Sequence, residues 1–372
     1  MSRNLFFGIT NRVLMLIAAA LTLLSVLSVL VNPAKFWVAS LLGLCFVPLA
    51  LLDFVLLLWA LKRRSKSFVI PLVALIPAAL FLGLYVRLPF SGDTDVQENE
   101  DKEVVTALHG GKNGLKIMTY NVGRFMLAQE QDALKGRHQC MDSVFRFIVE
   151  EQPDIVCLQE FYIDEGESVA KVIPKYLKGY AAEYYLYSTQ YGLCGNLTLS
   201  RLKSVGKGKL TFDSSANLAI YSDYETDGHR FRIYNCHFES YNISFTGLVR
   251  SLTNSQTDVF AQTGVKMKRS ITMRPRQVDK VLYDIENCPI ESFVCGDFND
   301  NPMSYTYYRM TRGRRDAFVD AGHGFGATYS LLWPMLRIDY LLYPNSYRAV
   351  SYDVPRIGLS DHYPAIAEIV YN

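Results

Sequence analysis

The pattern of hydrophobic positions changes near residue 90. Three long apolar runs fill the first part of the chain, at about Val13–Val31, Phe36–Leu61 and Phe68–Leu88. A helix rises about 1.5 Å per residue and a membrane span needs roughly 20 apolar residues, so each run is long enough. A cleaved signal peptide has a shorter apolar region and is not followed by two further runs. The pattern therefore predicts three transmembrane helices in residues 1–90.

Basic residues in the short loops predict how these helices are oriented. Arg3 and Arg12 precede the first run, and the segment Lys62–Lys66 separates the second run from the third. Cytoplasmic loops carry the excess of Lys and Arg, so both segments are expected in the cytoplasm. Three crossings then carry residue 91 onward to the other side. We expect a multi-pass protein of the inner or plasma membrane, with a cytoplasmic amino terminus and an extracytoplasmic carboxyl-terminal domain.

Beyond residue 90 the pattern is that of a linker followed by a globular domain. Residues 91–114 are polar, acidic and end in glycines, which is typical of a linker. Residues 115–372 alternate short apolar stretches with turn residues, which predicts strands and helices of one domain. Besides the apolar run before Asp297, the predicted strands are Leu115–Val122, Asp154–Glu160, Tyr180–Tyr187, Leu193–Leu199, Asn217–Ser222, Phe231–His237, Leu336–Leu342 and Ile366–Val370, and the predicted helices are Cys140–Glu150 and Arg276–Glu286.

Charge separates the two parts of the chain further. Residues 1–90 contain eight basic residues and one acid, Asp53, whereas the whole chain has 38 basic and 36 acidic residues. Subtraction leaves 30 basic and 35 acidic residues in 91–372, a formal charge of −5 that gives no support to a large polyanion-binding surface. Asp53 lies inside the second apolar run, where an ionisable group is a functional hint. Since no second polar partner accompanies it, the runs are more typical of an anchor than of a transporter.

Polar side chains follow several of the predicted strands. Asp297 and Asn299 come directly after an apolar run, and residues two apart in an extended chain point to the same side. An ordinary strand that ends in an Asp/Asn turn gives the same pattern. A structural role is likewise the alternative for His237 at the end of its strand. Further candidates lie at other strand ends and loops, and the whole set is Asn121, Glu160, His237, Asp297, Asn299, Asp339, Asp361 and His362.

These residue types favour a hard divalent cation and phosphate chemistry. The sequence has no Cys/His spacing of the zinc type, no nucleophile elbow and no glycine-rich phosphate loop. Oxygen donors with few imidazoles favour Mg²⁺ or Mn²⁺. The adjacent Asp361 and His362 offer a base that works near neutral pH once it is oriented. Together they predict hydrolysis of a phosphate ester with water as the nucleophile.

The order of the short motifs resembles the endonuclease/exonuclease/phosphatase superfamily, typified by deoxyribonuclease I. The segments that carry the resemblance are Thr119–Val122, Leu158–Glu160, Asn235–Ser240, Gly296–Asn299, Arg337–Tyr340 and Ser360–His362. It covers about residues 115–372. The resemblance implies a four-layer α/β sandwich, in which two packed β-sheets are flanked by helices, here preceded by the three predicted transmembrane helices. It also implies a site at one end of the sandwich.

The resemblance implies metal ligands and a general base. Glu160 is similar to the principal metal ligand of the family, with Asn121 and Asp361 beside it. His362 is similar to the general base, and Asp339 is the residue that orients it. The expected cofactor is Mg²⁺ or Mn²⁺. Positioning and charge stabilisation do most of the work in phosphoryl transfer, which agrees with such a site.

The remaining candidates are expected to act on the substrate. By the same resemblance Asp297 and Asn299 position the attacking water and the phosphate, and His237 stabilises the pentacovalent oxygens. Nucleases, sphingomyelinases, inositol-phosphate phosphatases and DNA-end phosphodiesterases share these motifs, because one scaffold hosts many functions. A predicted membrane anchor favours a phospholipid or sphingolipid headgroup, or an extracellular nucleic acid, over a role in genomic repair.

A membrane-tethered binding module with the same fold and no turnover is the alternative. Each candidate position holds a chemically competent residue, which favours the enzyme. The expected partners are a phosphate-ester substrate and a lipid bilayer that contacts residues 1–90, and we predict no protein partner.

The cysteines give a further expectation. Cys157, Cys236 and Cys295 lie within apolar strand segments, which favours buried free thiols over disulfides. An extracytoplasmic domain would permit disulfides, so the state of Cys140, Cys194 and Cys288 is left open.

Overall fold

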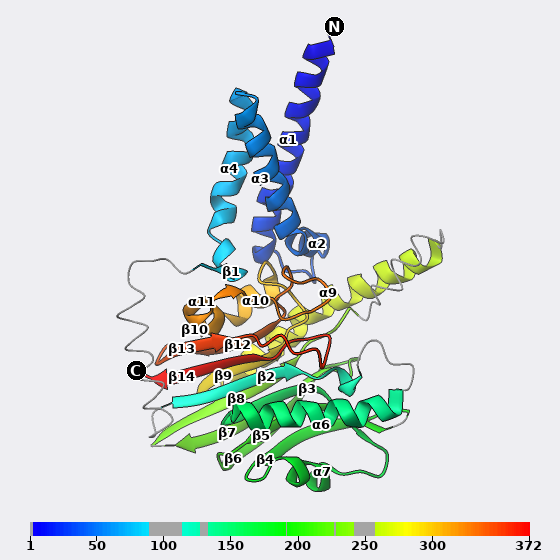
Figure 1. Ribbon diagram of the computed structural model, residues 1–372, viewed down its shortest axis with the longest axis vertical. Coiled ribbons are helices and arrows are strands. Elements are labelled where there is room, and N and C mark those ends of the chain that lie inside the picture. The colour runs from blue at the N-terminus through cyan, green and yellow to red at the C-terminus, as the bar shows by residue number, and fades with distance from the viewer. Residues whose placement is uncertain (1–2, 89–113, 127–132, 191, 227, 242–256) are drawn as a thin grey trace. The chain divides into compact units, whose positions relative to one another are not determined.

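The computed structural model describes residues 3–88, 114–126, 133–190, 192–226, 228–241 and 257–372 (Figure 1). Two compact units share the chain. The first consists of Met1–Tyr85, Ser240–Arg276 and Asp300–Arg309, and the second of Val86–Glu239, Gln277–Asn299 and Met310–Asn372. The predicted linker lies outside the described residues up to position 113.

The apolar runs form helices whose lengths correct the predicted count of three spans. The helices are α1 (Arg3–Leu27), α2 (Val38–Leu44), α3 (Phe46–Lys62) and α4 (Val69–Ala79). Among the described residues one stretch, Ile9–Leu30, is long and apolar enough to cross a membrane, and α2 with α3 makes a second only if the two are joined across a 60° bend. The first stretch lies near the amino terminus, where a signal sequence meets the same criteria.

The third apolar run forms a helix that is too short to cross a membrane. Its helix, α4, has 11 residues and is therefore about 16 Å long, well short of the ~30 Å hydrocarbon layer. The end of the run is instead strand β1 (Val86–Arg87), which pairs with β11 (Gly324–Phe325) in the second unit. The composition of an apolar run does not indicate where a helix within it ends. Since one crossing and two crossings leave the carboxyl-terminal domain on opposite sides of a bilayer, the helices do not support the predicted multi-pass topology and orientation.

The first unit also contains the segment Asp300–Arg309, which follows the predicted strand that ends at Asp297. Val29, Phe46 and Met303 are buried in one hydrophobic cluster. The side-chain amide of Asn301 donates to the carbonyl of Gly43 at 3.0 Å. A Cβ at Gly43 would lie 2.2 Å from the carbonyl oxygen of Met303, so glycine allows this close approach. The segment 300–309 therefore packs on the apolar helices, which the hydrophobic pattern did not predict.

The second unit is built on two six-stranded mixed sheets. In spatial order the β9 sheet contains β10 (Arg314–Asp316), β12 (Asp339–Pro344), β9 (Glu291–Asp297), β8 (His229–His237), β7 (Leu218–Thr226) and β6 (Ser204–Thr211). The β2 sheet contains β13 (Tyr347–Asp353), β14 (Ala365–Tyr371), β2 (Gly114–Asn121), β3 (Ile155–Asp164), β5 (Gly192–Ser200) and β4 (Ala181–Ser188). In each sheet one central pair, β2 with β3 and β8 with β9, is parallel.

Helices flank this pair of sheets. Figure 1 shows α6 (Ala133–Glu151) and α7 (Val169–Tyr176) along the β2 sheet. The predicted helix Cys140–Glu150 is confirmed as part of α6, and its Val144, Phe145 and Ile148 are fully buried against that sheet. Among its described residues the second unit also contains α11 (Ala317–Ala321) and the end of α9 (Thr257–Glu286), whose first part belongs to the first unit together with most of α10 (Tyr305–Met310). The α/β fold with two sheets between helices is thus confirmed.

The core between the sheets is mainly apolar and contains a polar connection near the strand ends. Ile117 and Ile155 of the β2 sheet share a buried cluster with Phe293 and Leu341 of the β9 sheet. The connection is Asn235, which is fully buried and accepts a 2.7 Å hydrogen bond from the Gln159 amide. The Asn235 amide donates to the carbonyls of Leu158 and Leu197, both at 3.1 Å. These bonds fix one sheet relative to the other.

Candidate active site

The strand register brings the predicted residues to one end of the two sheets. In the β9 sheet His237 pairs with Asp297, and Asp297 pairs with Asp339. In the β2 sheet Asn121 pairs with Gln159, the residue before Glu160. Parallel strands end at the same edge of a sheet, which places His237 beside Asp297 and Asn121 beside Gln159, whereas the antiparallel β12 begins at this edge with Asp339.

Asp297 lies at the centre of the site and is almost completely buried. Its carboxylate accepts hydrogen bonds from the Asn121 amide at 2.9 Å, from the Asn299 backbone N–H at 2.8 Å and from the Asn299 amide at 3.1 Å. The Nε2 atoms of His237 and His362 lie 3.7 and 3.8 Å from the same carboxylate. Burial raises the pKa of Asp297 to about 6, although the two histidines act to lower it.

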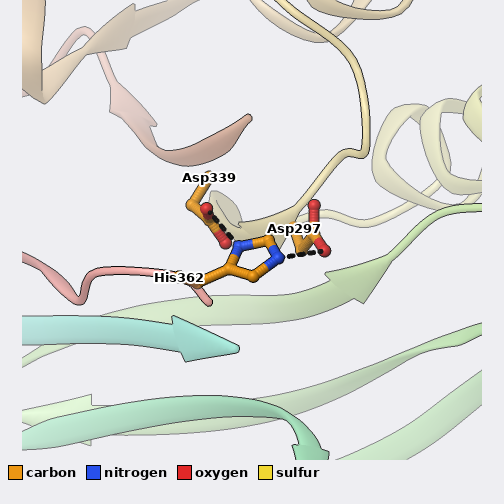
Figure 2. A group of neighbouring side chains, drawn as sticks. All are labelled: Asp297, Asp339 and His362. Carbon is orange, nitrogen blue, oxygen red and sulfur yellow. Dashed lines mark hydrogen bonds and ion pairs between the residues drawn. The ribbon is translucent and has the colours of Figure 1, made fainter. Parts of the chain in front are cut away.

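His362 and Asp339 form a buried pair beside Asp297. Figure 2 shows the imidazole of His362 between the two carboxylates, with one nitrogen toward each. Its Nδ1 lies 2.8 Å from Asp339, and its Nε2 faces Asp297. The backbone N–H of Asp339 donates to the Thr328 hydroxyl at 3.1 Å, which holds the carboxylate in place. Burial lowers the pKa of His362, but the carboxylates of Asp339 and Asp297 outweigh burial and raise it to about 10.

Glu160 reaches the site because strand β3 contains a bulge. The register with β5 shifts between Leu158 and Phe161, and Glu160 has a left-handed φ of 51°. Non-glycine residues rarely adopt this conformation, and bulges commonly redirect a side chain next to a site. The Glu160 side chain is 27% exposed, and its carboxylate lies 3.8 Å from His237 Nε2. It therefore faces both the buried site and solvent.

Asp361 lies at the solvent side of the same end. Its side chain is exposed, and a Cβ built at Gly123 would be 3.2 Å from Asp361 Oδ1. The Ser360 hydroxyl donates to the Asn121 carbonyl at 2.8 Å and to the Asp361 carboxylate at 3.2 Å. The loop that carries Asp361 is thus fastened to the end of β2.

Two oxygen-rich groups could hold a divalent cation. Asp297, Asp339 and His362 have ligand atoms within 4.8 Å of one another, but His362 Nδ1 is already hydrogen-bonded to Asp339. Glu160 and Asp361 instead keep carboxylate surface open to solvent. These two carboxylates fit the hard, partly hydrated coordination that Mg²⁺ prefers.

One buried nitrogen in the site is unsatisfied. Among the described residues, His237 Nε2 has no hydrogen-bond partner, although it is buried between Glu160 and Asp297. A buried polar group without a partner is costly and marks a place where a ligand atom is expected. His237 thus offers a nitrogen to an oxygen bound between these carboxylates.

Two further residues, which the sequence did not predict, lie at the site. Tyr329 forms a backbone bridge with His362, and its ring packs edge-on to the imidazole at 5.2 Å. Burial raises the pKa of Tyr329 to about 12, with Asp361 and Asp297 adding to the effect, so its hydroxyl stays protonated. Arg124 lies 3.4 Å from the Glu160 carboxylate. Neither residue stands in a strand motif, so the pattern gave no signal for them.

Comparisons with known proteins agree with this architecture. A family profile described as the endonuclease/exonuclease/phosphatase family matches residues 118–362, and one described as a domain of unknown function matches residues 4–85. The comparison with curated proteins found no match.

Among solved structures, the endonuclease/exonuclease/phosphatase of Bacteroides vulgatus is 18% identical with a TM-score of 0.51, covering 70% of this chain and 100% of that chain. The catalytic domain of human Nocturnin, with a bound sulfate anion, is 19% identical with a TM-score of 0.51, covering 70% and 94%. A functionally unknown conserved protein from Enterococcus faecalis V583 is 17% identical with a TM-score of 0.52, covering 69% and 100%. At these identities the likeness concerns the fold alone.

Proposed function

The chain belongs to the endonuclease/exonuclease/phosphatase family, and from this premise we propose that it is a divalent-metal-dependent phosphoesterase that cleaves its substrate with an activated water. The observation that carries the proposal is the convergence of Glu160, His237, Asp297 and His362, linked by nitrogen–oxygen distances of 3.7 and 3.8 Å. The substrate is a nucleic acid or a phospholipid or sphingolipid headgroup.

Three residues are proposed as metal ligands. Glu160, Asp361 and the amide oxygen of Asn121 would hold Mg²⁺ or Mn²⁺ at the solvent side of the site. When bound, the cation would polarise a phosphoryl oxygen and lower the pKa of the neighbouring His362 by repulsion. The open carboxylates of Glu160 and Asp361 support this assignment.

The buried residues are proposed to carry the proton and the phosphate. His362, held by Asp339 through Nδ1, accepts a proton from water at Nε2. Asp297 and Asn299 position that water and a phosphate oxygen, since the Asn299 amide is fixed by the carboxylate and by the Phe238 carbonyl at 3.0 Å. The unsatisfied Nε2 of His237 binds an oxygen of the pentacovalent phosphorus.

Hydrolysis of bis-p-nitrophenyl phosphate by the full chain in detergent tests this proposal. We expect turnover with Mg²⁺ or Mn²⁺ that EDTA abolishes, and a loss of at least about 100-fold in Glu160→Gln and His362→Ala. The matched control is His229→Ala, because His229 is exposed at the other end of the strand that carries His237. Equal rates in all four proteins would reject the enzyme and leave the binding module. A panel of nicked or abasic duplex, single-stranded nucleic acid, sphingomyelin, phosphatidylinositol phosphates and nucleotides then identifies the substrate.

We also propose that α1 anchors the protein in a membrane. The supporting observation is the apolar stretch Ile9–Leu30, which is long enough to cross it. An amino-terminal epitope tag should remain on the mature chain and stay with the membrane pellet after alkaline carbonate extraction. Loss of the tag with release of the chain would identify a cleaved signal sequence instead.

A further inference from the structure

The turn after strand β2 is held in an unusual backbone conformation. Gly123, Arg124 and Phe125 have consecutive left-handed φ angles of 51°, 57° and 55°. L-residues with a Cβ avoid this region, and such residues persist where the surrounding structure holds them, often at functional sites. Phe125 supplies that hold, since it is fully buried and packs edge-on against Phe161 with ring centroids 5.7 Å apart.

This conformation places Arg124 at the solvent side of the site. Its Nε atom lies 3.4 Å from the Glu160 carboxylate, and 48% of the side chain is exposed. The preceding residue, Gly123, approaches Asp361 so closely that a Cβ there would lie 3.2 Å from Oδ1. The guanidinium is thus placed between solvent and the residues proposed to bind the metal.

Two features indicate that Arg124 can exchange Glu160 for another partner. An ion pair that is half exposed contributes little, so another partner can replace it at small cost. A guanidinium also presents five N–H donors in a planar fork that matches the oxygens of a phosphate. A divalent cation on Glu160 would repel Arg124 from that carboxylate, and a phosphate bound to the cation would be its natural new partner.

We propose that Arg124 is the phosphate-binding residue of this site, and that it stays ion-paired with Glu160 until a metal ion and a phosphate bind together. This rests on the proposed function, in which Glu160 is a metal ligand. Arg124 then has opposite effects on two binding events. It competes with a metal that enters alone, and it strengthens the binding of a metal that enters with phosphate.

Binding of Mn²⁺ to the full chain in detergent, measured by electron paramagnetic resonance with and without inorganic phosphate, tests the proposal. In Arg124→Ala we expect affinity for Mn²⁺ alone to rise about two- to fivefold, because the competitor is gone. We expect phosphate to raise the affinity of the wild type about tenfold or more, and that of Arg124→Ala less than about twofold. Arg124→Lys keeps the charge without the fork and should recover part of this enhancement.

Kinetics give a second measurement. Arg124→Ala should raise KM for the phosphate ester about tenfold or more and change kcat less, since a binding contact is lost. The matched control is Arg146→Ala, because Arg146 is exposed on α6, and it should match the wild type in both measurements.

The outcomes separate this inference from the proposed function. If Glu160→Gln loses Mn²⁺ binding while Arg124→Ala keeps wild-type affinity and wild-type phosphate enhancement, Arg124 has no phosphate role and the metal site stands. If the wild type binds no Mn²⁺, or Glu160→Gln binds it equally well, the proposed function and this inference both fail.

Discussion

Replacing Asn235 with alanine tests whether the polar connection between the sheets stabilises the fold. The side chain accepts a 2.7 Å hydrogen bond from Gln159 and donates to two backbone carbonyls at 3.1 Å. A typical hydrogen bond contributes about 1 kcal/mol net, so the loss of these bonds should cost about 3 kcal/mol. The Gln159 amide keeps its bonds to Thr119 and to the Cys157 carbonyl, which limits the penalty for unsatisfied groups.

Such a loss is large against the 5–15 kcal/mol that stabilise most proteins, and it should lower Tm by roughly 6–12 °C. Urea unfolding of the full chain in detergent, followed by tryptophan fluorescence, measures it. The matched control is Asn287→Ala, because the exposed amide of Asn287 makes a 2.7 Å bond to a backbone carbonyl that water can replace. We expect this control to stay within about 0.5 kcal/mol of the wild type. If Asn235→Ala also stays within that range, the connection does not stabilise the sheets.

Three further predictions concern the site and its support. Asp339→Asn removes the charge from the 2.8 Å contact with His362 and should lower kcat/KM about 10- to 150-fold, equivalent to about 1.5–3 kcal/mol, whereas a change below twofold would contradict the orienting role. Gly296→Ala should destabilise the fold by about 3 kcal/mol in urea unfolding, because Gly296 has a φ of 136° and the new Cβ would lie 1.9 Å from the Cys236 carbonyl oxygen. Wild-type stability of this variant would disprove the clash. Burial raises the pKa of Cys236, which makes its thiol unreactive in the native second unit. We expect Ellman's reagent to label the partly exposed Cys288 rapidly and the buried thiols of this unit only after unfolding. Rapid labelling of a buried thiol would show that the unit opens.

The strand pattern predicted the positions of the site residues that end parallel strands better than the positions of the other site residues. Asn121, His237 and Asp297 end the central strands β2, β8 and β9, and a polar residue after an apolar run is visible in the sequence. Asp339 reaches the same edge from the opposite direction, because β12 runs antiparallel to β9 and begins at this residue. The predicted strand Leu336–Leu342 placed Asp339 in its middle, so the pattern did not predict that Asp339 lies at the edge of the sheet where the site is. The expectation that Asp339 orients His362 came from the family resemblance and not from the strand pattern.

Long-range register explains what the sequence could not predict. The bulge that turns Glu160 toward His237 is defined by the pairing of β3 with β5, which are separated in the chain by α7 and β4. Tyr329 meets His362 through a backbone bridge between two loops, and such pairings leave no periodic pattern. The prediction of a third membrane span was wrong for a related reason, since the last residues of the third apolar run pair with β11 as strand β1.

The site depends on both sheets at once, and this gives the buried polar connection its significance. Glu160 and Asn121 come from the β2 sheet, whereas His237 and Asp297 come from the β9 sheet. Apolar packing between sheets is not directional, so burial alone would permit small sliding movements of one sheet over the other. Hydrogen bonds require defined distances and angles, and those of Asn235 lie two residues before His237 in the strand. The distance from Glu160 to His237 is therefore set by this polar connection as well as by the hydrophobic core.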